Sequence, residues 1–177
     1  KSDEIAALNS VAAFAGRSLA QSEVFAYSLN EALRTSGADA GAVYLVEGGE
    51  FRLKGAAGFD DLFTKDGQAV PLGAFAGFER KKQGWIMVEA EFPDNEFSRL
   101  LKLFGTALVS VSPMAYDNEV RGLLLITYRD ASRFEGESVP FFEALASCVS
   151  VASGHSGLFQ KELASRKFLD RLIQQMP

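Results

Sequence analysis

This chain has almost none of the residues on which most catalytic and metal sites depend. Its 177 residues include one cysteine, Cys148, and one histidine, His155. A single cysteine excludes an internal disulfide framework and any metal site built from several cysteines. A serine-histidine-acid triad needs a histidine held beside its nucleophile, and the chain has no sharp turn of the kind that exposes such a serine. We therefore expect this fragment to be non-catalytic.

Long hydrophobic runs and large basic clusters are missing as well. No apolar stretch approaches the roughly 20 residues that cross a bilayer, and the chain does not start with a signal peptide. The formal net charge is -5, and the longest basic cluster, residues 80–82, is interpreted as a solvated helix end. We expect no nucleic-acid partner, no membrane contact in this fragment and a cytoplasmic location. Because the chain begins with Lys1, we expect a piece of a longer protein.

The clearest local pattern that is present is a hairpin within residues 37–58. Gly37 follows a helical pattern and can adopt the left-handed conformation that ends a helix. Residues 43–46 are β-branched, aromatic or aliphatic, and Gly48-Gly49 suits the positive φ angles of a two-residue turn. The first strand is apolar on both faces, so we expect both faces of the sheet to be covered.

Two helical patterns precede this hairpin, and an irregular segment follows it. Between Ile5 and Leu19 apolar residues recur every three or four positions as one narrow stripe, and a second stripe runs from residue 24 to residue 33. Apolar residues within 59–83 do not recur at any sustained spacing. We expect a covering loop there, with one short helix near residues 75–82.

A short strand, a helix and a second hairpin come next. Residues 84–88 are a candidate strand, and Asp94 is placed to cap a helix that ends at Gly105. Residues 106–128 contain two β-rich runs joined by a polar Asp-Asn turn. Pro113 has no amide donor, so we expect it at a strand end or a bulge.

From Phe134 the spacing of apolar residues is helical again, and no turn signal ends the predicted helix before Met176. The last part of this helix has coiled-coil spacing. The whole pattern predicts an α/β (α+β) domain with a central, mainly antiparallel sheet of five to six strands. N- and C-terminal helices are expected on one face, and loops with short helices on the other.

The order of these segments resembles a GAF domain, the small-molecule-sensing module of phytochromes, cyclic-nucleotide phosphodiesterases and bacterial sensor kinases. The resemblance covers residues 22–160. It is carried by GADAGAVYLVEGGEFRLKGAAG, VPLGAFAGFERKKQG, GTALVSVSPM, EVRGLLLITY and the helix that Phe134 opens.

The end of the chain, FLDRLIQQMP, is similar to the signalling linker that joins such domains to a following PAS or kinase domain. The resemblance therefore implies a bacterial two-component sensor of the histidine kinase type. Its parts would be an N-terminal helix over residues 1–21, a GAF domain over 22–160 and a signalling helix over 161–177 that leads to an output domain.

In GAF domains ligands lie between the sheet and the loops that cover it, so the resemblance places a pocket under the irregular segment. Many of the 15 phenylalanines fall there, and apolar walls with a few polar groups are typical of small-molecule sites. Hydroxyls of the central strands can point into such a pocket or satisfy one another, and the aromatic rings can also fill the space themselves. The candidate ligand-binding residues are Tyr44, Phe59, Phe63, Phe75, Phe78, Trp85, Phe92, Phe97, Ser110, Ser112 and Thr127.

The ligand chemistries of the family find little support in the residues. The Asn-Lys pair of the cyclic-nucleotide signature is absent. The segment FPDNEF matches a bilin-binding domain in position but lacks its Asp-Ile-Pro core and a following cysteine. Free methionine sulfoxide reductases of this fold use several cysteines, whereas Cys148 is interpreted as a buried, unreactive thiol. The cofactor, if there is one, is therefore unknown.

Two further candidate sites have simpler interpretations. Haem needs an axial ligand, and His155 lies on the predicted terminal helix, where a surface or dimer-facing position is expected. An acidic cluster can hold a hard cation, or it can be a solvated loop. The cluster consists of Glu89, Glu91, Asp94 and Glu96.

These observations support two functions of different kinds. The first is a sensory and dimerisation module of a multidomain signalling protein, which binds a small molecule or a partner and passes the change through its terminal helices. It is expected to form a homodimer through the helices Ile5–Leu19 and Phe159–Met176. The second is a structural interaction domain that binds no ligand.

Overall fold

The computed structural model describes residues 2–17, 20–151 and 174 of the chain. Its strands are β1 (Ala40–Glu47), β2 (Glu50–Ala57), β3 (Ala69–Pro71), β4 (Trp85–Val88), β5 (Leu108–Tyr116) and β6 (Glu119–Tyr128). Its helices are α1 (Ser2–Arg17), α2 (Gln21–Ser36), α3 (Asp61–Asp66), α4 (Glu96–Leu103) and a C-terminal helix described over residues 138–151. The short 3-10 turns are η1 (Leu72–Phe75), η2 (Phe78–Arg80), η3 (Glu89–Glu91) and η4 (Ala131–Arg133).

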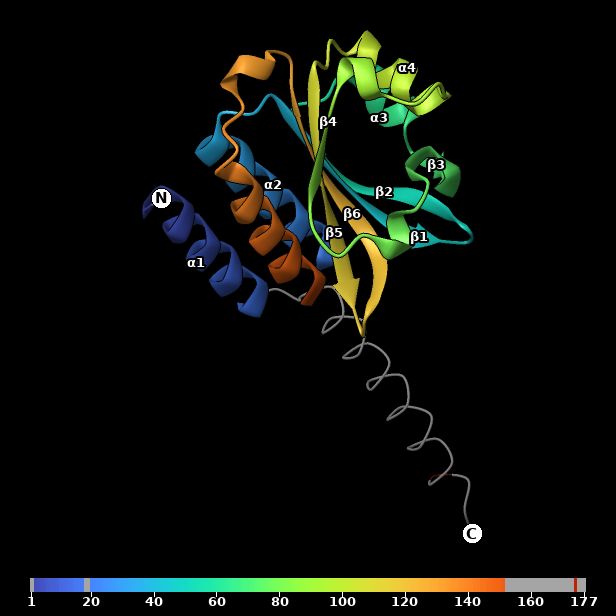
Figure 1. The fold of residues 1–177 in the computed structure, drawn as a ribbon. Coiled ribbons are helices and arrows are strands. Elements are labelled where there is room, and N and C mark those ends of the chain that lie inside the picture. Colours follow the sequence, from blue (N-terminus) through green and yellow to red (C-terminus); the bar gives the residue numbers. More distant parts are fainter. Residues whose placement is uncertain (1, 18–19, 152–173, 175–177) are drawn as a thin grey trace.

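The described residues form three layers (Figure 1). The middle layer is a six-stranded antiparallel sheet in the order β3-β2-β1-β6-β5-β4. One face is covered by α1, α2 and the C-terminal helix, and the other by short elements that include α3 and α4. We call the second cover the lid (residues 59–83 and 89–104). The predicted fold class is confirmed.

Both predicted hairpins form, and they join edge to edge in one sheet. Gly48 and Gly49 have φ angles of 60° and 78° in the first turn, and Asp117 and Asn118 have φ angles of 54° and 63° in the second. Strand β1 pairs with β6 between the hairpins, and the side chains of successive residues on both strands enter opposite layers. Burial on both faces of β1 follows from this central position.

The join between the hairpins requires glycine at residue 122. A Cβ atom there would clash with the carbonyl oxygen of Tyr44 and would lie 2.7 Å from Leu45 Cδ2. Both neighbours belong to β1, whose backbone is held by hydrogen bonds on two sides. The position therefore has no space for a side chain.

The helical layer packs on the sheet through a continuous apolar cluster. Ala7 and Val11 of α1 are fully buried, whereas Ile5 is 60% exposed. The predicted stripe on the first helix is therefore only partly the buried face. Phe14 stacks on Tyr27 of α2 with ring centroids 4.5 Å apart, so α1 is part of the packed layer. The remaining buried side chains come from α2 and the C-terminal helix: Phe25, Leu29, Ala32, Phe141, Phe142, Leu145, Ala146 and Val149.

The lid is more ordered than the sequence predicted. Residues 59–83 were expected to be a loop with one short helix near 75–82, but they contain α3, β3, η1 and η2. Helix α3 begins where the Asp60 carboxylate accepts a hydrogen bond from Phe63 N at 2.8 Å. These elements span three to six residues each, which is too short to show a period.

Two predicted boundaries are wrong by a few residues. Asn95, not Asp94, caps α4, because its extended backbone lets the side chain accept from Ser98 N at 2.8 Å. Asp94 pairs instead with Arg99 at 3.1 Å. The last helix begins at residue 138 rather than at Phe134, since η4 and a turn come first.

Pro113 lies inside β5, opposite Leu123 of β6, rather than at the strand end. It is close to the irregular register between Met114 and Ala115, and it lies beyond the last residue of β5 that pairs with β4, Val111. Its missing amide therefore costs no hydrogen bond to β4.

The predicted extension of the last helix to Met176, together with His155 and the segment Phe159–Met176, lies outside the described residues. Among the helices that are described, none is both long and apolar enough to cross a bilayer.

One buried hydrogen bond joins the lid to the sheet. The Tyr44 hydroxyl of β1 donates to the carbonyl oxygen of Gly67, at the end of α3, at 2.7 Å. Burial raises the pKa of this phenol, so the hydroxyl stays protonated at neutral pH and can donate. The lid is therefore fastened to the sheet by a polar contact as well as by its aromatic rings.

We predict that Gly122→Ala will destabilise the protein because β1 must move to accept the methyl group. The expected loss is about 1–3 kcal/mol of unfolding free energy in urea, as for other overpacked sites. Gly73→Ala is the matched control, since a Cβ atom there meets nothing within 4 Å. Equal midpoints for the two variants would contradict this account of the join.

We predict that Tyr44→Phe will cost about 1–2 kcal/mol, because it leaves a buried carbonyl without its donor. Tyr27→Phe keeps the ring that stacks on Phe14 and should change stability by less than about 0.5 kcal/mol. Urea unfolding of both variants measures the difference. A Tyr44→Phe variant as stable as the wild type would show that the hydrogen bond does not hold the lid.

Candidate functional site

Most of the predicted ligand-binding residues come together between the sheet and the lid. They form one apolar cluster although they come from eight elements or connections of the chain. Phe63, Phe75 and Phe78 are at most 5% exposed, while Phe59 and Trp85 are partly buried at its margin. The members predicted from the sequence are Tyr44, Phe59, Phe63, Phe75, Phe78, Trp85, Phe92 and Phe97.

The rings contact one another in a continuous network. Phe97 is central, with ring centroids 5.8 Å from Tyr44, 5.9 Å from Phe63 and 5.4 Å from Phe75. Phe59 stacks on Phe63 at 3.7 Å. Because the rings touch, they fill much of the space between the sheet and the lid.

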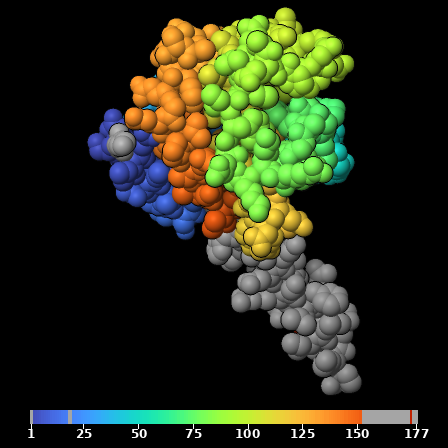
Figure 2. All heavy atoms as spheres, viewed as in Figure 1, coloured from blue at the N-terminus to red at the C-terminus, as the bar shows by residue number. Residues whose placement is uncertain are grey.

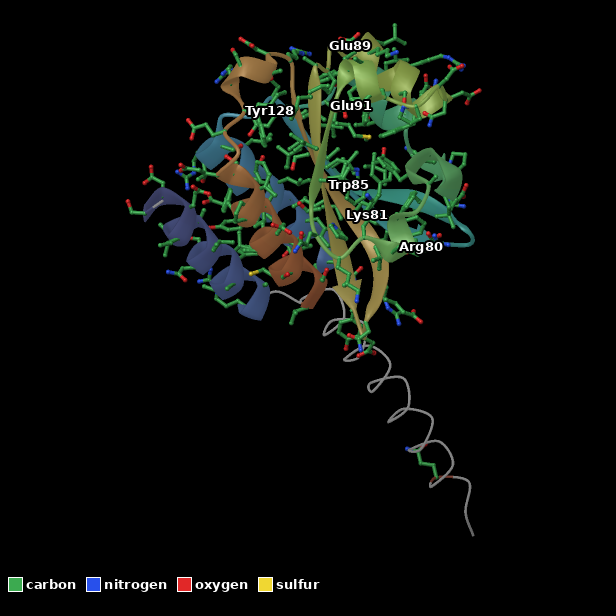
Figure 3. The ribbon with its side chains drawn as sticks, in the orientation of Figure 1. Arg80, Lys81, Trp85, Glu89, Glu91 and Tyr128 are labelled. Carbon is green, nitrogen blue, oxygen red and sulfur yellow. The ribbon has the colours of Figure 1, made fainter. Side chains whose placement is uncertain are left out.

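Trp85 of β4 lies at the edge of the apolar cluster, and Figure 3 shows Lys81 beside it. The Lys81 ammonium lies 5.2 Å from the centre of the indole ring, within the range of a cation-π contact. The indole is partly exposed, so the contact is worth about 0.5–1 kcal/mol.

The predicted hydroxyl groups are not all on the lid side. Ser110 and Ser112 have the same side-chain direction as Leu108 and Met114, which belong to the helical layer's cluster. They are fully buried on the face opposite the lid, so they cannot share its pocket. Thr127 lies on the lid-facing side of β6 and donates to the Ala40 carbonyl oxygen at 3.3 Å.

A cavity of about 430 Å³ opens beside the aromatic cluster, between the end of α3, strand β3 and helix α4. Its apolar wall includes Phe97, Val70 and Leu100, all at least nine-tenths buried. Leu103, which is 75% exposed, stands at its mouth. The full lining is Asp66, Ala69, Val70, Pro71, Glu96, Phe97, Arg99, Leu100 and Leu103.

Charged groups line this cavity together with its apolar wall. Asp66, Glu96 and Arg99 belong to the lining, and Arg99 is paired with Asp94 by a contact in which both side chains are exposed. Such an arrangement fits a small molecule with an apolar body and a polar group that stays near solvent. The cavity has the size of a small-molecule site, within the range of about 300–1,000 Å³.

The alternative chemistries have little support in the part of the chain that the structure describes. No group of three or more histidine, cysteine or acidic residues there is arranged to hold a metal ion. Within the acidic cluster, Glu91 accepts a hydrogen bond from Val88 N at 3.0 Å. Burial raises the pKa of the Cys148 thiol, which makes it a weaker nucleophile at neutral pH.

Several lining residues were not predicted because they belong to elements that the sequence did not reveal. Asp66 ends α3, and Val70 is the buried residue of β3, while Leu100 was predicted only as part of a helix face. Asp60 three residues before Phe63 was an available helix-start signal for α3. No local signal indicated that β3 would lie beside α4.

Comparison with known proteins supports the fold. No protein-family model matches the chain, and no curated protein matches it. Among solved structures, the GAF domain of a phosphoenolpyruvate-protein phosphotransferase from Coxiella burnetii is similar with a TM-score of 0.74 and 14% identity, over 90% of this chain and 97% of that one.

Two further solved structures come from other kinds of protein. The phycoerythrobilin-bound GAF domain of a cyanobacterial phytochrome has a TM-score of 0.71 and 16% identity, over 89% of this chain and 97% of that one. Residues 122 to 287 of a methyl-accepting chemotaxis protein have a TM-score of 0.70 and 16% identity, over 84% and 98%. The similarity spans nearly the whole of each domain at low identity, and we conclude that this chain has the fold of a GAF domain.

Proposed function

We propose that this chain is the sensory and dimerisation module of a multidomain signalling protein, in which it binds a small molecule under the lid and acts through its terminal helices. The observation that carries this proposal is the cavity of about 430 Å³ against the aromatic cluster. Solved domains with this fold occur in signalling proteins, and one of them holds a bilin. The fragment itself acts without catalysis.

The short elements of the lid support a ligand that enters there. Helix α3 has six residues and β3 has three, so each is held mainly by contacts with its neighbours rather than by its own hydrogen bonds. Elements of this kind open at low free-energy cost compared with a central strand. A ligand that displaces part of the aromatic network can therefore be accommodated without unfolding the sheet.

The parent protein is proposed to be a bacterial sensor of the histidine kinase type. The support is the similarity of the segment FLDRLIQQMP to a signalling linker, and that segment belongs to the proposed signalling helix over residues 161–177. The GAF domain proper is proposed to span residues 22–160, with residues 1–21 as an N-terminal dimerisation helix. A cytoplasmic location is part of the same proposal.

The homodimer is proposed to form through the helices Ile5–Leu19 and Phe159–Met176. On the described part of this surface, α1 and the beginning of the C-terminal helix share a hollow of about 450 Å³ with an apolar interior. Ile5, Leu8, Pro140 and Phe141 line it, and Ile5 is 60% exposed. Burying such a surface against a second copy would remove apolar area from water.

A structural interaction domain without a ligand remains the second candidate. The contacts between Phe59, Phe63, Phe75 and Phe97 favour it, because rings that already pack together need no ligand to fill the space. The two candidates differ in whether the cavity accepts a molecule.

We predict that a small molecule found by a melting screen will raise the melting temperature of the wild type by about 5–10 °C at a concentration of 100 times its Kd. Leu100→Trp fills the cavity and should abolish the shift. Leu62→Trp is the matched control, because Leu62 is 51% exposed and does not line the cavity. A shift that persists in Leu100→Trp would place the ligand elsewhere, and the absence of any ligand would favour the structural role.

We predict that sedimentation will give about twice the 19.2 kDa of one chain, and that Ile5→Glu will shift the protein toward the monomer. Leu62→Glu places the same charge on another exposed leucine and should leave the mass unchanged. A wild type that stays monomeric at high concentration would contradict the dimer, and so would an Ile5→Glu variant that remains dimeric.

A further inference from the structure

Strand β4 is the free edge of the sheet on the side of the C-terminal helix. Its register with β5 directs the backbone groups of Trp85 and Met87 toward β5, and Glu89 N continues this series by donating to Ala107 O. The amides of Gly84, Ile86 and Val88 therefore point away from the sheet. An edge of this kind is open to pairing with another strand unless something covers it.

Two of these three outward amides donate hydrogen bonds to carboxylates. Val88 N donates to Glu91 Oε1 at 3.0 Å, and Gly84 N donates to Glu143 Oε2 at 2.9 Å. At the opposite edge of the sheet, β3 has three residues and ends at Pro71, which has no amide to offer. Both edges of the sheet are thus partly protected against pairing with another strand.

The two carboxylates differ in where they come from. Glu91 is three residues away from its donor, so its hydrogen bond stays within one turn. Glu143 is 59 residues from Gly84 and belongs to the C-terminal helix. Its contact therefore joins two parts of the chain that are far apart in the sequence.

The fit around Gly84 is tight. A Cβ atom there would lie 3.1 Å from Glu143 Cγ, 3.3 Å from Ser112 Oγ and 3.4 Å from the carbonyl oxygen of Val111. The backbone approaches the helix closely because Gly84 has no side chain. The hydrogen bond is consequently partly shielded from water, which strengthens it relative to an exposed contact.

Next to this contact a groove lies between the lid and the helix. This groove of about 730 Å³ is lined by Lys81 and Lys82 of the lid and by Glu143, Ala144 and Ser147 of the helix. Figure 2 shows the surfaces of these two segments adjoining, green for the lid and orange for the helix. The hydrogen bond from Gly84 N to Glu143 Oε2 links the segment after η2 to the helix beside this groove.

We propose that Glu143 is a positioning residue that couples the lid to the C-terminal helix by holding the amide of Gly84. Phe78 lies three residues before Lys81, and its ring packs against the ring of Phe51 of the sheet with centroids 4.8 Å apart. In this proposal, a change in the packing of Phe78 shifts η2, the loop that follows it and Gly84. Glu143 transfers the shift to the helix. The coupling rests on the proposed sensory function, in which the helix carries the response.

Hydrogen exchange on the whole chain tests the coupling without a ligand. Phe78→Leu is used to disturb the lid, and exchange is followed at Gly84 and along residues 138–151. Amides of β6 serve as the reference for global opening, because they lie at the centre of the sheet. We expect Phe78→Leu to change exchange in the helix relative to β6 in the wild-type background and to have no such effect in Glu143→Ala.

Glu143→Ala by itself should speed exchange at Gly84 by about tenfold, as expected for loss of a hydrogen bond to a charged group. Glu143→Gln keeps an acceptor and should retain the coupling. Glu91→Ala is the matched control, since it frees Val88 and leaves the helix and its response to Phe78→Leu unchanged.

The outcomes distinguish this proposal from the proposed function. If Phe78→Leu alters helix exchange equally with and without Glu143, or does not alter it in the wild type, the coupling through Glu143 is overturned. Ligand binding and dimerisation are measured separately by melting and sedimentation. Their results do not depend on the hydrogen-exchange comparison of the Phe78 and Glu143 variants. A purely structural Glu143 would change exchange at Gly84 but would leave the response to Phe78→Leu intact.

Discussion

The pairing of β1 with β6 is the contact on which the rest of this structure depends. It joins two hairpins into one sheet, and it lies at a position where the backbone of β1 leaves no space for a side chain on Gly122. Because the joined strands are apolar on both faces, the sheet needs a cover on each side. The helical layer covers one face of the sheet, and the lid covers the other.

The two covers differ in how they are held. The helical layer consists of long helices with a continuous apolar cluster, whereas the lid consists of elements of three to eight residues held by aromatic contacts and by the hydrogen bond from Tyr44 to Gly67. Cooperative helices resist local opening more than short elements do. The adaptable side of the sheet is therefore the lid, and the cavity lies there as well.

The hairpins and the second helix were predictable because their signals are local. Gly48-Gly49 and the Asp117-Asn118 turn permit positive φ angles, and Gly37 ends α2 with a φ of 73°. The aromatic cluster was predictable from a family resemblance and from the concentration of phenylalanines, but its neighbours Val70 and Leu100 were not. For Ser110 and Ser112 the sequence left open whether their hydroxyls point into the pocket, and the structure places both on the face opposite the lid, since serine is small enough to be buried on either side of a central strand.

The amino-acid sequence by itself determined the main strands and helices, the burial of the central strands on both faces and the scarcity of catalytic side chains. These properties depend on residues that are neighbours along the chain, so periodicity, turn chemistry and composition reveal them. The tertiary structure alone decided that α3, β3 and α4 meet around one cavity, and that Glu143 reaches an amide 59 residues away. Those contacts depend on strand order and on the packing of layers, which bring together segments that are far apart in the sequence. Local sequence patterns do not show which distant segments will meet.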